Sequence, residues 1–202
     1  MSDGTLTRDF FERPSDAVAS DLVGSLLRVR GVAGTTTVRI VETEAYAGRD
    51  DPASHAFRGP TPRTAIMFGP AGFLYVYRIY GIHWCLNVVC GPDGTASAVL
   101  IRAGEIVTMG GANGPLAVPV PLRGPGVFTR ELGITGVDNG QDCCSGARGR
   151  FNFAHGGGAI FTVGHSERIG ISQGRDRLWR YYWEGHPALS KAPSTRTRSR
   201  PG

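Results

Sequence analysis

The segment FLYVYRIYGIHWCLNVVC, residues 73–90, constrains the fold of this chain more than any other stretch. It is rich in aromatic and β-branched residues, which favour strands, and Gly81 interrupts it near the middle. Two strand-like runs on either side of a glycine predict a β-hairpin with its tip near Tyr80 and Gly81. The chain is therefore expected to contain an antiparallel sheet.

Strand patterns recur along the rest of the chain, whereas helical patterns are few. Further strands are expected at 25–31, 35–46, 97–105, 159–164, 167–172 and 178–185. Short helices are expected from Ser15 to about Val23 and within 127–134. Glycine-rich and proline-rich loops are expected at 48–63 and 110–126, and a mobile insertion at 135–158. Strands with few helices and short connections favour an α+β fold, a single domain with a curved, open-barrel-like and mostly antiparallel sheet flanked by short helices.

The length and composition are those of one globular domain. The chain has 202 residues, of which 41% are hydrophobic and 19% charged. No apolar run approaches the roughly 20 residues of a membrane helix, and the N-terminus is polar and acidic, so a cytoplasmic protein is expected. The expected organisation is a flexible N-terminus at 1–8, a domain at 9–190 and a basic, disordered tail at 191–202.

The charge balance is consistent with a polyanionic partner. The net charge is +5, and of 22 basic residues only Lys191 is a lysine. Arginine suits contacts with phosphates and bases, because its planar guanidinium offers several donors. Many basic proteins bind no nucleic acid, so the net charge alone does not identify the partner. It supports a nucleic-acid partner only if a matching binding site is also present.

The strand VRIVETEAY, residues 38–46, carries two carboxylates. Alternation along a strand would place Val38, Ile40, Glu42, Glu44 and Tyr46 on one face. Burying an ionised carboxylate without a partner is costly, so either these glutamates face solvent at the strand end or the fold holds them for chemistry. A carboxylate beside aromatic rings can act as a general base that orients a water.

Two more polar residues interrupt apolar strands. Arg102 is expected to share a strand face with Ala98 and Leu100, where it needs an acidic or anionic partner. It serves either as a structural ion pair or as the group that fixes a strand carboxylate and its water. Asn87 either satisfies backbone groups or shapes a pocket.

The hairpin concentrates aromatic side chains around one turn. Tyr75, Tyr77 and Trp84 fit an aromatic core, whereas Tyr80 comes directly before the hairpin glycine and is expected to be exposed. An exposed ring on a rigid tip, beside Arg78, suits insertion between stacked bases.

Other common catalytic signatures are absent from the sequence. There is no P-loop, GxGxxG, HExxH or GxSxG motif, and the cysteines and histidines lack zinc spacing. We therefore expect neither a metal nor a cofactor.

In these motifs the chain resembles the alkyladenine (3-methyladenine) DNA glycosylases, also called methylpurine glycosylases. The resemblance spans about residues 10–190. The matching motifs are RIVETEAY at 39–46, His55, TPR at 61–63, MF at 67–68, G-x-LYVY-x-IYG at 72–81, CLN at 85–87 and IRA at 101–103. Weaker agreement follows at 124–126, 132–134, 168–172 and 179–190, and the segments 106–123 and 135–158 depart from the family pattern.

The resemblance implies base excision, in which a damaged purine is flipped out of duplex DNA and water attacks the anomeric carbon of its sugar. By position, Glu44 matches the general base and Arg102 the residue that holds the water and the carboxylate. The implied base pocket consists of Tyr46, His55 and Tyr77, which sandwich the base, and Asn87, which rejects the guanine amine. The implied DNA contacts are Tyr80, which fills the vacated stack, and Arg63, Arg78 and His83, which contact the backbone. Glu42 matches an acidic position with a supporting role.

The expected activity is monofunctional hydrolysis by a monomer on double-stranded DNA. A glycosylase that also nicks the strand uses an amine, and the only lysine, Lys191, is placed in the tail; the N-terminal amine is the other candidate. Two alternatives remain open. One is a glycosidase or phosphodiesterase that uses Glu42 and Glu44 as a pair, and the other is a non-catalytic protein that binds lesions.

Overall fold

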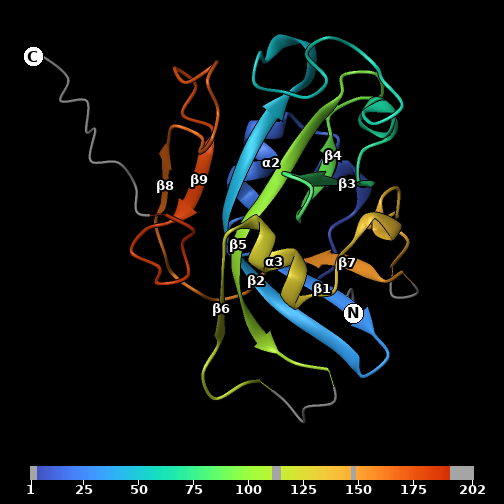
Figure 1. Ribbon diagram of the computed structural model, residues 1–202. Helices are drawn as coiled ribbons and strands as arrows, with labels where there is room; N and C mark the ends of the chain where they lie inside the picture. The colour runs from blue at the N-terminus through green and yellow to red at the C-terminus, as the bar shows by residue number, and fades with distance from the viewer. Residues whose placement is uncertain (1–3, 111–114, 147–148, 192–202) are drawn as a thin grey trace, which may run out of the picture.

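The computed structural model describes residues 4–110, 115–146 and 149–191. Within these ranges, nine strands form one curled, antiparallel sheet that resembles half of a barrel, with a few short helices around it (Figure 1). The strands are β1 (Leu26–Gly31), β2 (Gly34–Ala47), β3 (Leu74–Ile79), β4 (His83–Cys90), β5 (Ser97–Thr108), β6 (Val120–Arg123), β7 (Phe151–Ala154), β8 (Val163–Ser166) and β9 (Arg180–Trp183). The α-helices are α1 (Arg8–Phe11), α2 (Ser15–Leu22) and α3 (Pro125–Glu131), and the 3-10 turns are η1 (Gly48–Asp50), η2 (Ala65–Phe68) and η3 (Gly136–Asp138). The expectation of an α+β fold with a curved antiparallel sheet is confirmed.

The two longest strands, β2 and β5, pair at the centre of the sheet. The order across the sheet is β3-β4-β5-β2-β1-β7, while β6 pairs with β5, and β9 pairs with both β2 and β8. The predicted hairpin is confirmed as β3 and β4, which pair from Leu74–Val88 to Ile79–His83 around a turn that contains Tyr80 and Gly81. The main core lies where α2 and α3 pack on β2 and β5, and it includes Leu22, Ile40, Ile101 and Phe128.

A β-bulge in β2 corrects the expected placement of the two glutamates. Ile40 pairs with Gly104 and Glu42 with Ala103, so Val41 is an extra residue that has no counterpart on β5. A bulge of this kind interrupts alternation and re-aims the residues that follow it. Val38 and Ile40 lie in the main core, whereas Val41 packs with Ala103 and Ala188 in a separate cluster.

Beyond the bulge the core-facing residues of β2 are Thr43 and Ala45. The Thr43 hydroxyl donates to the carbonyl of Ala19 in α2, and Ala45 belongs to the main core. Glu42 and Glu44 therefore leave β2 on the opposite face from Val38 and Ile40, and the expectation of one shared face was wrong.

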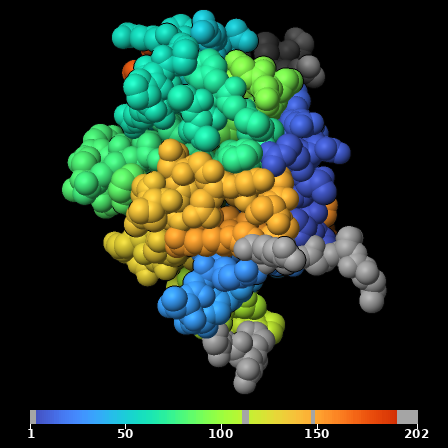
Figure 2. All heavy atoms as spheres, turned by 90° about the vertical axis from the view of Figure 1, so that its right-hand side faces the viewer, coloured from blue at the N-terminus to red at the C-terminus, as the bar shows by residue number. Residues whose placement is uncertain are grey.

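The segment expected as a mobile insertion, 135–158, is largely built into the body in its described residues. Its strand β7 pairs with β1, and Phe151, Phe153 and Cys143 are buried in the core. Figure 2 shows residues of this segment (orange) below the segment around residues 50–75 (teal) and beside the N-terminal residues (dark blue). The insertion prediction missed a strand of only four residues, because glycines and cysteines around it hide the pattern.

Three other expectations change in detail. The loop expected at 110–126 contains β6, which pairs with β5, and its end begins α3. The strand expected at 159–164 is displaced to β8, and the one expected at 167–172 is irregular backbone without a strand.

The chain ends are only partly described. Within the N-terminal stretch 1–8, Leu6 is buried and its N–H donates to the carbonyl of Phe153. In the expected basic tail only Lys191 falls within the described residues. No helix of the described residues is long and apolar enough to cross a membrane.

Candidate active site

Glu44 lies fully buried on β2 and accepts three hydrogen bonds. Its Oε2 accepts from Nη1 of Arg102 at 3.1 Å and from the Tyr46 hydroxyl at 2.9 Å. Its Oε1 accepts from the backbone N–H of Ile169 at 2.6 Å. A carboxylate has about four lone-pair sites, so among the described residues Oε1 retains one site for a further donor such as water.

The charge state of Glu44 reflects opposing effects. Burial raises the pKa of Glu44 above its ordinary value of 4.5, and it is the largest effect. Arg102, the Ile169 N–H and the Tyr46 hydroxyl lower this pKa, while the nearby Glu42 raises it. A carboxylate whose pKa is raised is a stronger proton acceptor when ionised, as a general base requires.

Arg102 connects Glu44 to Glu42. Its Nε donates to Oε1 of Glu42 at 3.0 Å, while its Nη1 donates to Glu44. The two carboxylates raise the pKa of Arg102 although burial lowers it, so the guanidinium stays charged. Arg102 therefore pairs with both strand carboxylates, where the sequence indicated a pair with one of them.

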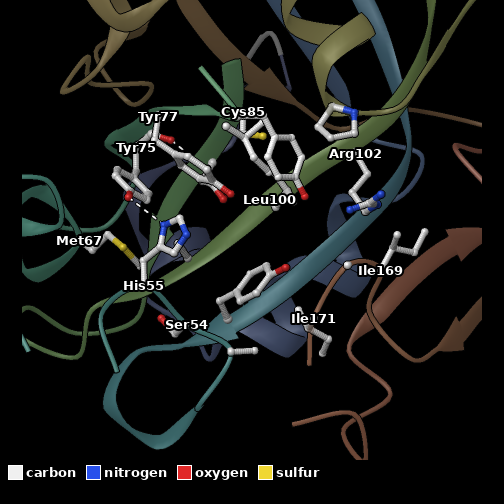
Figure 3. Close-up of a pocket in the computed structure, with 18 residues that line it drawn as sticks. Ser54, His55, Met67, Tyr75, Tyr77, Cys85, Leu100, Arg102, Ile169 and Ile171 are labelled. Carbon is white, nitrogen blue, oxygen red and sulfur yellow. Dashed lines mark hydrogen bonds between the residues drawn. The ribbon is translucent and has the colours of Figure 1, made fainter. Parts of the chain in front are cut away.

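A cavity of about 190 Å³ opens beside this pair. The residues expected to form the base pocket and the wedge all line it, together with Arg102: Tyr46, His55, Tyr77, Tyr80 and Asn87. In Figure 3, His55, Tyr75 and Tyr77 lie at one side of the cavity, and Arg102 and Ile169 lie at the other. Ligand pockets for drug-sized molecules span about 300–1,000 Å³, so this cavity suits a single small ring system.

The aromatic wall of the cavity is held in place by contacts between its rings. The rings of His55 and Tyr77 meet edge-to-face at 4.6 Å between centroids, and Tyr75 and Tyr77 lie 5.2 Å apart. Nδ1 of His55 lies 3.1 Å from the Tyr75 hydroxyl. Burial, with a contribution from Arg63, lowers the pKa of His55, so the ring is neutral at neutral pH.

Tyr80 stands at the hairpin tip in an unusual backbone conformation. Its side chain is 84% exposed and its φ is +53°, the left-handed region that residues other than glycine rarely adopt. Gly81 follows with a φ of +70°. The turn thus holds a large ring outward, at the edge of the cavity.

The remaining predicted site residues take different positions. Asn87 is buried, and its Nδ2 donates to the backbone carbonyl of Tyr75 at 3.0 Å while the residue also lines the cavity. Arg63, Arg78 and His83 are exposed and do not line the cavity. The Arg63 guanidinium lies 4.9 Å from the Tyr77 ring and that of Arg78 lies 5.7 Å from the Trp84 ring.

Sequence reasoning assigned no role to several residues that complete the site. Ile169 supplies its N–H to Glu44, and Arg180 and Ser190 both contact Glu42. Arg168 contacts Asp51 and packs on the Tyr46 ring. A signal was present, because Arg168, Ile169, Arg180 and Ser190 fall in the weaker matching motifs at 168–172 and 179–190. In the described ranges, no group of three or more His, Cys, Asp or Glu side chains could hold a metal ion.

Comparison with known protein families identifies the class of protein that carries this curled sheet, aromatic cavity and buried glutamate. The sequence profile described as "Methylpurine-DNA glycosylase (MPG)" matches residues 9–187. The chain therefore belongs to the methylpurine-DNA glycosylase family, as the sequence motifs indicated. It is a hydrolase of N-glycosyl bonds, a DNA repair glycosylase for alkylated purines.

Individual relatives are similar over almost their whole length. A protein of Frankia casuarinae named "Putative 3-methyladenine DNA glycosylase" is 44% identical over 195 residues, which cover 90% of each chain. Proteins with the same name from Burkholderia lata and Rhodopseudomonas palustris (strain ATCC BAA-98 / CGA009) are 44% and 45% identical. These matches cover 95% and 94% of this chain, and 93% of each relative.

Proposed function

We propose that the chain flips an alkylated or deaminated purine out of duplex DNA and hydrolyses its N-glycosidic bond with a water that Glu44 activates. The expected lesions are of the 3-methyladenine, 7-methylguanine, hypoxanthine and ethenoadenine class. The observation that carries the proposal is one small cavity with an aromatic wall at one side and, at the other, Arg102, whose guanidinium holds the buried Glu44 directly behind the cavity lining. Enzymes that act on a base must extrude it from the stack and read it in such a pocket.

In the proposed mechanism each of these residues has a separate role. Tyr46, His55 and Tyr77 stack on the flipped base, and a cationic alkylated purine is attracted to their faces. Glu44 takes the proton of the attacking water, and its negative charge stabilises the positive charge that develops on the sugar. Arg102 holds the carboxylate in place. Neutral hypoxanthine is a poorer leaving group than a cationic base and needs protonation as well.

The exposed residues act on the DNA around the lesion. Tyr80 fills the gap that the flipped base leaves, which offsets part of the few kcal/mol that unstacking costs. Arg63, Arg78 and His83 contact the backbone. Asn87 restricts the pocket against the exocyclic amine of guanine. The protein acts as a monomer on double-stranded DNA.

The contacts of Glu42 argue against the glycosidase alternative, in which Glu42 and Glu44 form a catalytic pair. Glu42 is fully buried and accepts from Arg102, Arg180 and Ser190, so it is not placed to protonate a leaving group or to activate a second water. An inverting pair needs room for a water between its two carboxyl groups, whereas here the Arg102 guanidinium contacts both.

The test is single-turnover base release in EDTA from duplex oligonucleotides that carry one hypoxanthine, ethenoadenine or methylated purine. Wild type is expected to release the base, and Glu44→Gln is expected to bind the same duplex without release. Strand cleavage should require alkali, and borohydride should trap no covalent complex, because neither of the two candidate amines, Lys191 and the N-terminal amine, is proposed to attack the sugar. Tight lesion binding without release by wild type would identify a lesion-binding protein instead.

A further inference from the structure

Glu42 accepts four hydrogen bonds from the described residues around it. Its Oε1 accepts from Nε of Arg102 at 3.0 Å, from Nε of Arg180 at 2.8 Å and from the Ser190 hydroxyl at 2.7 Å. Its Oε2 accepts from the backbone N–H of Ser190 at 2.7 Å. Three of the four donors crowd Oε1, and Oε2 retains one of its lone-pair sites. Of these donors only Arg102 lines the cavity, whereas Arg102, Tyr46 and Ile169, which all bond to Glu44, line it.

The contact with Glu42 fixes how Arg102 faces Glu44. The donors of a guanidinium lie in one plane at fixed angles, so anchoring Nε on Glu42 sets the direction of Nη1 toward Glu44. Nη2 of Arg102 points to the Ser190 hydroxyl at 3.4 Å. All three nitrogens of Arg102 are therefore engaged, and the side chain has one orientation in which it can hold Glu44.

Arg180 and Ser190 bring the C-terminal part of the chain to this network. Arg180 lies on β9, is almost fully buried, and donates from Nη2 to the carbonyl of Lys191 at 2.6 Å. Its Nη1 donates to the Ser166 hydroxyl on β8 at 3.3 Å. The network thus contains two carboxylates and two guanidinium groups, so its charges balance within the buried site.

We propose that Glu42, Arg180 and Ser190 are positioning residues that hold the Arg102 guanidinium against Glu44, and that Glu42 does not itself accept a proton. The inference rests on the proposed function, because it concerns the geometry of the same hydrolytic step. It assigns a task to the C-terminal segment around Ser190, which closes the network over Glu42. A misplacement of a catalytic group by about 1 Å can slow a reaction about 100-fold.

The inference predicts a change in the pH dependence of the rate constant, because charged and titratable groups surround Glu44. They are Glu42 and Tyr46 on β2, Arg102 on β5, Cys85 on β4 and Arg168 before Ile169. Glu42 raises the pKa of Glu44, so replacing Glu42 by a neutral residue lowers that pKa. The acid limb of the pH–rate profile should then move to lower pH, while the rate constant at the plateau falls.

The experiment compares wild type, Glu42→Gln and Glu44→Gln in single-turnover release of 7-methylguanine from a duplex, across pH. Glu42→Gln should lose about 100-fold in the plateau rate constant, shift its acid limb to lower pH, and keep wild-type affinity for a duplex with a tetrahydrofuran abasic site. Loss of release as complete as in Glu44→Gln would overturn the inference, because Glu42 would then take part directly. An unchanged rate and pH profile would overturn it too.

Two further variants keep the test decisive. Ser190→Ala removes the hydroxyl bonds to Glu42 and Arg102 without changing charge, so it should lower the rate by about tenfold and leave the acid limb in place. If Glu42→Gln does not fold, Ser190→Ala alone tests the inference. An unchanged rate constant in Ser190→Ala would then contradict it. Glu105→Gln is the matched control, because Glu105 is another carboxylate near an arginine, Arg39, on the same sheet. If wild type releases no base, the proposed function fails before the variants are compared.

Discussion

The hydroxyl of Tyr46 donates to the same oxygen of Glu44 that Arg102 contacts, at 2.9 Å from Tyr46 and 3.1 Å from Arg102. Tyr46 also lines the cavity. One side chain therefore belongs both to the wall of the cavity and to the hydrogen bonds that hold the carboxylate. If a flipped purine stacks on Tyr46 as proposed, its binding and the basicity of the Glu44 carboxylate are linked through this ring.

Replacing Tyr46 by phenylalanine separates these two tasks. The ring remains, but the hydrogen bond that lowers the pKa of Glu44 is lost, so that pKa rises further. We expect the acid limb of single-turnover release of 7-methylguanine to move to higher pH and the rate constant at neutral pH to fall several-fold. Tyr181→Phe on β9 is the control, since Tyr181 does not contact Glu44. If the acid limb of the pH–rate profile of Tyr46→Phe does not move, the Tyr46 hydroxyl does not influence the pKa of Glu44.

Wild-type activity should follow the ionisation of Glu44. The carboxylate must be charged to accept a proton, and burial raises its pKa above 4.5. The rate constant for release of a cationic base should therefore decline as the pH falls, with its midpoint above 4.5. Because the pKa of Glu44 is higher in the folded state than in the unfolded state, protonation of Glu44 favours the folded state as the pH falls through this folded pKa.

Because protonation of Glu44 favours the folded state, activity should be lost at low pH while the protein is still folded. Far-ultraviolet circular dichroism at each pH should show folded protein at the midpoint of the rate profile. A midpoint at or below the ordinary pKa of a glutamate would contradict the assignment of Glu44 as a buried general base.

The sequence predicted the hairpin because its signal is local, whereas the match to the family motifs indicated the cavity residues Tyr46, His55, Tyr77 and Asn87. Tyr80 precedes a glycine in a strand-rich run, and its exposure follows from that position alone. The face that Glu44 occupies was not predictable in the same way. It depends on the extra residue Val41, and a bulge is defined by pairing with β5, about 60 residues further along the chain.

The buried network behind the site was missed for a related reason. Arg180 lies 138 positions from Glu42, and Ser190 lies 148 positions from it. No periodicity in either strand relates them, because β9 reaches β2 only through the topology of the sheet. The family motifs place these residues in order along the chain, but only the fold places them around one carboxylate.

Truncation of the hairpin tip should weaken lesion recognition without weakening the fold. Tyr80 is 84% exposed, so Tyr80→Ala removes little buried surface. If its ring replaces the flipped base in the stack, its loss removes part of the compensation for unstacking, which costs a few kcal/mol. We expect affinity for an ethenoadenine duplex to fall about tenfold or more, with an unchanged melting temperature.

Val32→Ala is the control for this variant. Val32 is a fully exposed apolar residue in the turn between β1 and β2, away from the cavity lining. Fluorescence anisotropy with lesion and undamaged duplexes measures both affinities. Equal affinities of Tyr80→Ala and Val32→Ala for the lesion duplex would exclude the wedge role.

Replacing Arg168 should act mainly by lowering the free energy of unfolding of the protein. Its side chain is completely buried, donates from Nη2 to Oδ1 of Asp51 at 2.8 Å and from Nη1 to the carbonyl of Ala45 at 2.8 Å. Its guanidinium also lies 4.7 Å from the Tyr46 ring and 5.4 Å from the Trp179 ring. Replacing it by methionine leaves the Asp51 carboxylate buried without its cation, which costs about 3–5 kcal/mol.

The matched control is Arg175→Met, which breaks the exposed ion pair between Arg175 and Glu167. That pair is surrounded by solvent, so its loss should cost at most about 1 kcal/mol. Urea denaturation followed by tryptophan fluorescence gives the free energy of unfolding of both variants. Equal losses in the two variants would show that the Arg168–Asp51 pair does not hold the wall behind Tyr46. A large loss in Arg168→Met alone, with slower base release by the folded fraction, would show that this buried pair supports the site from behind.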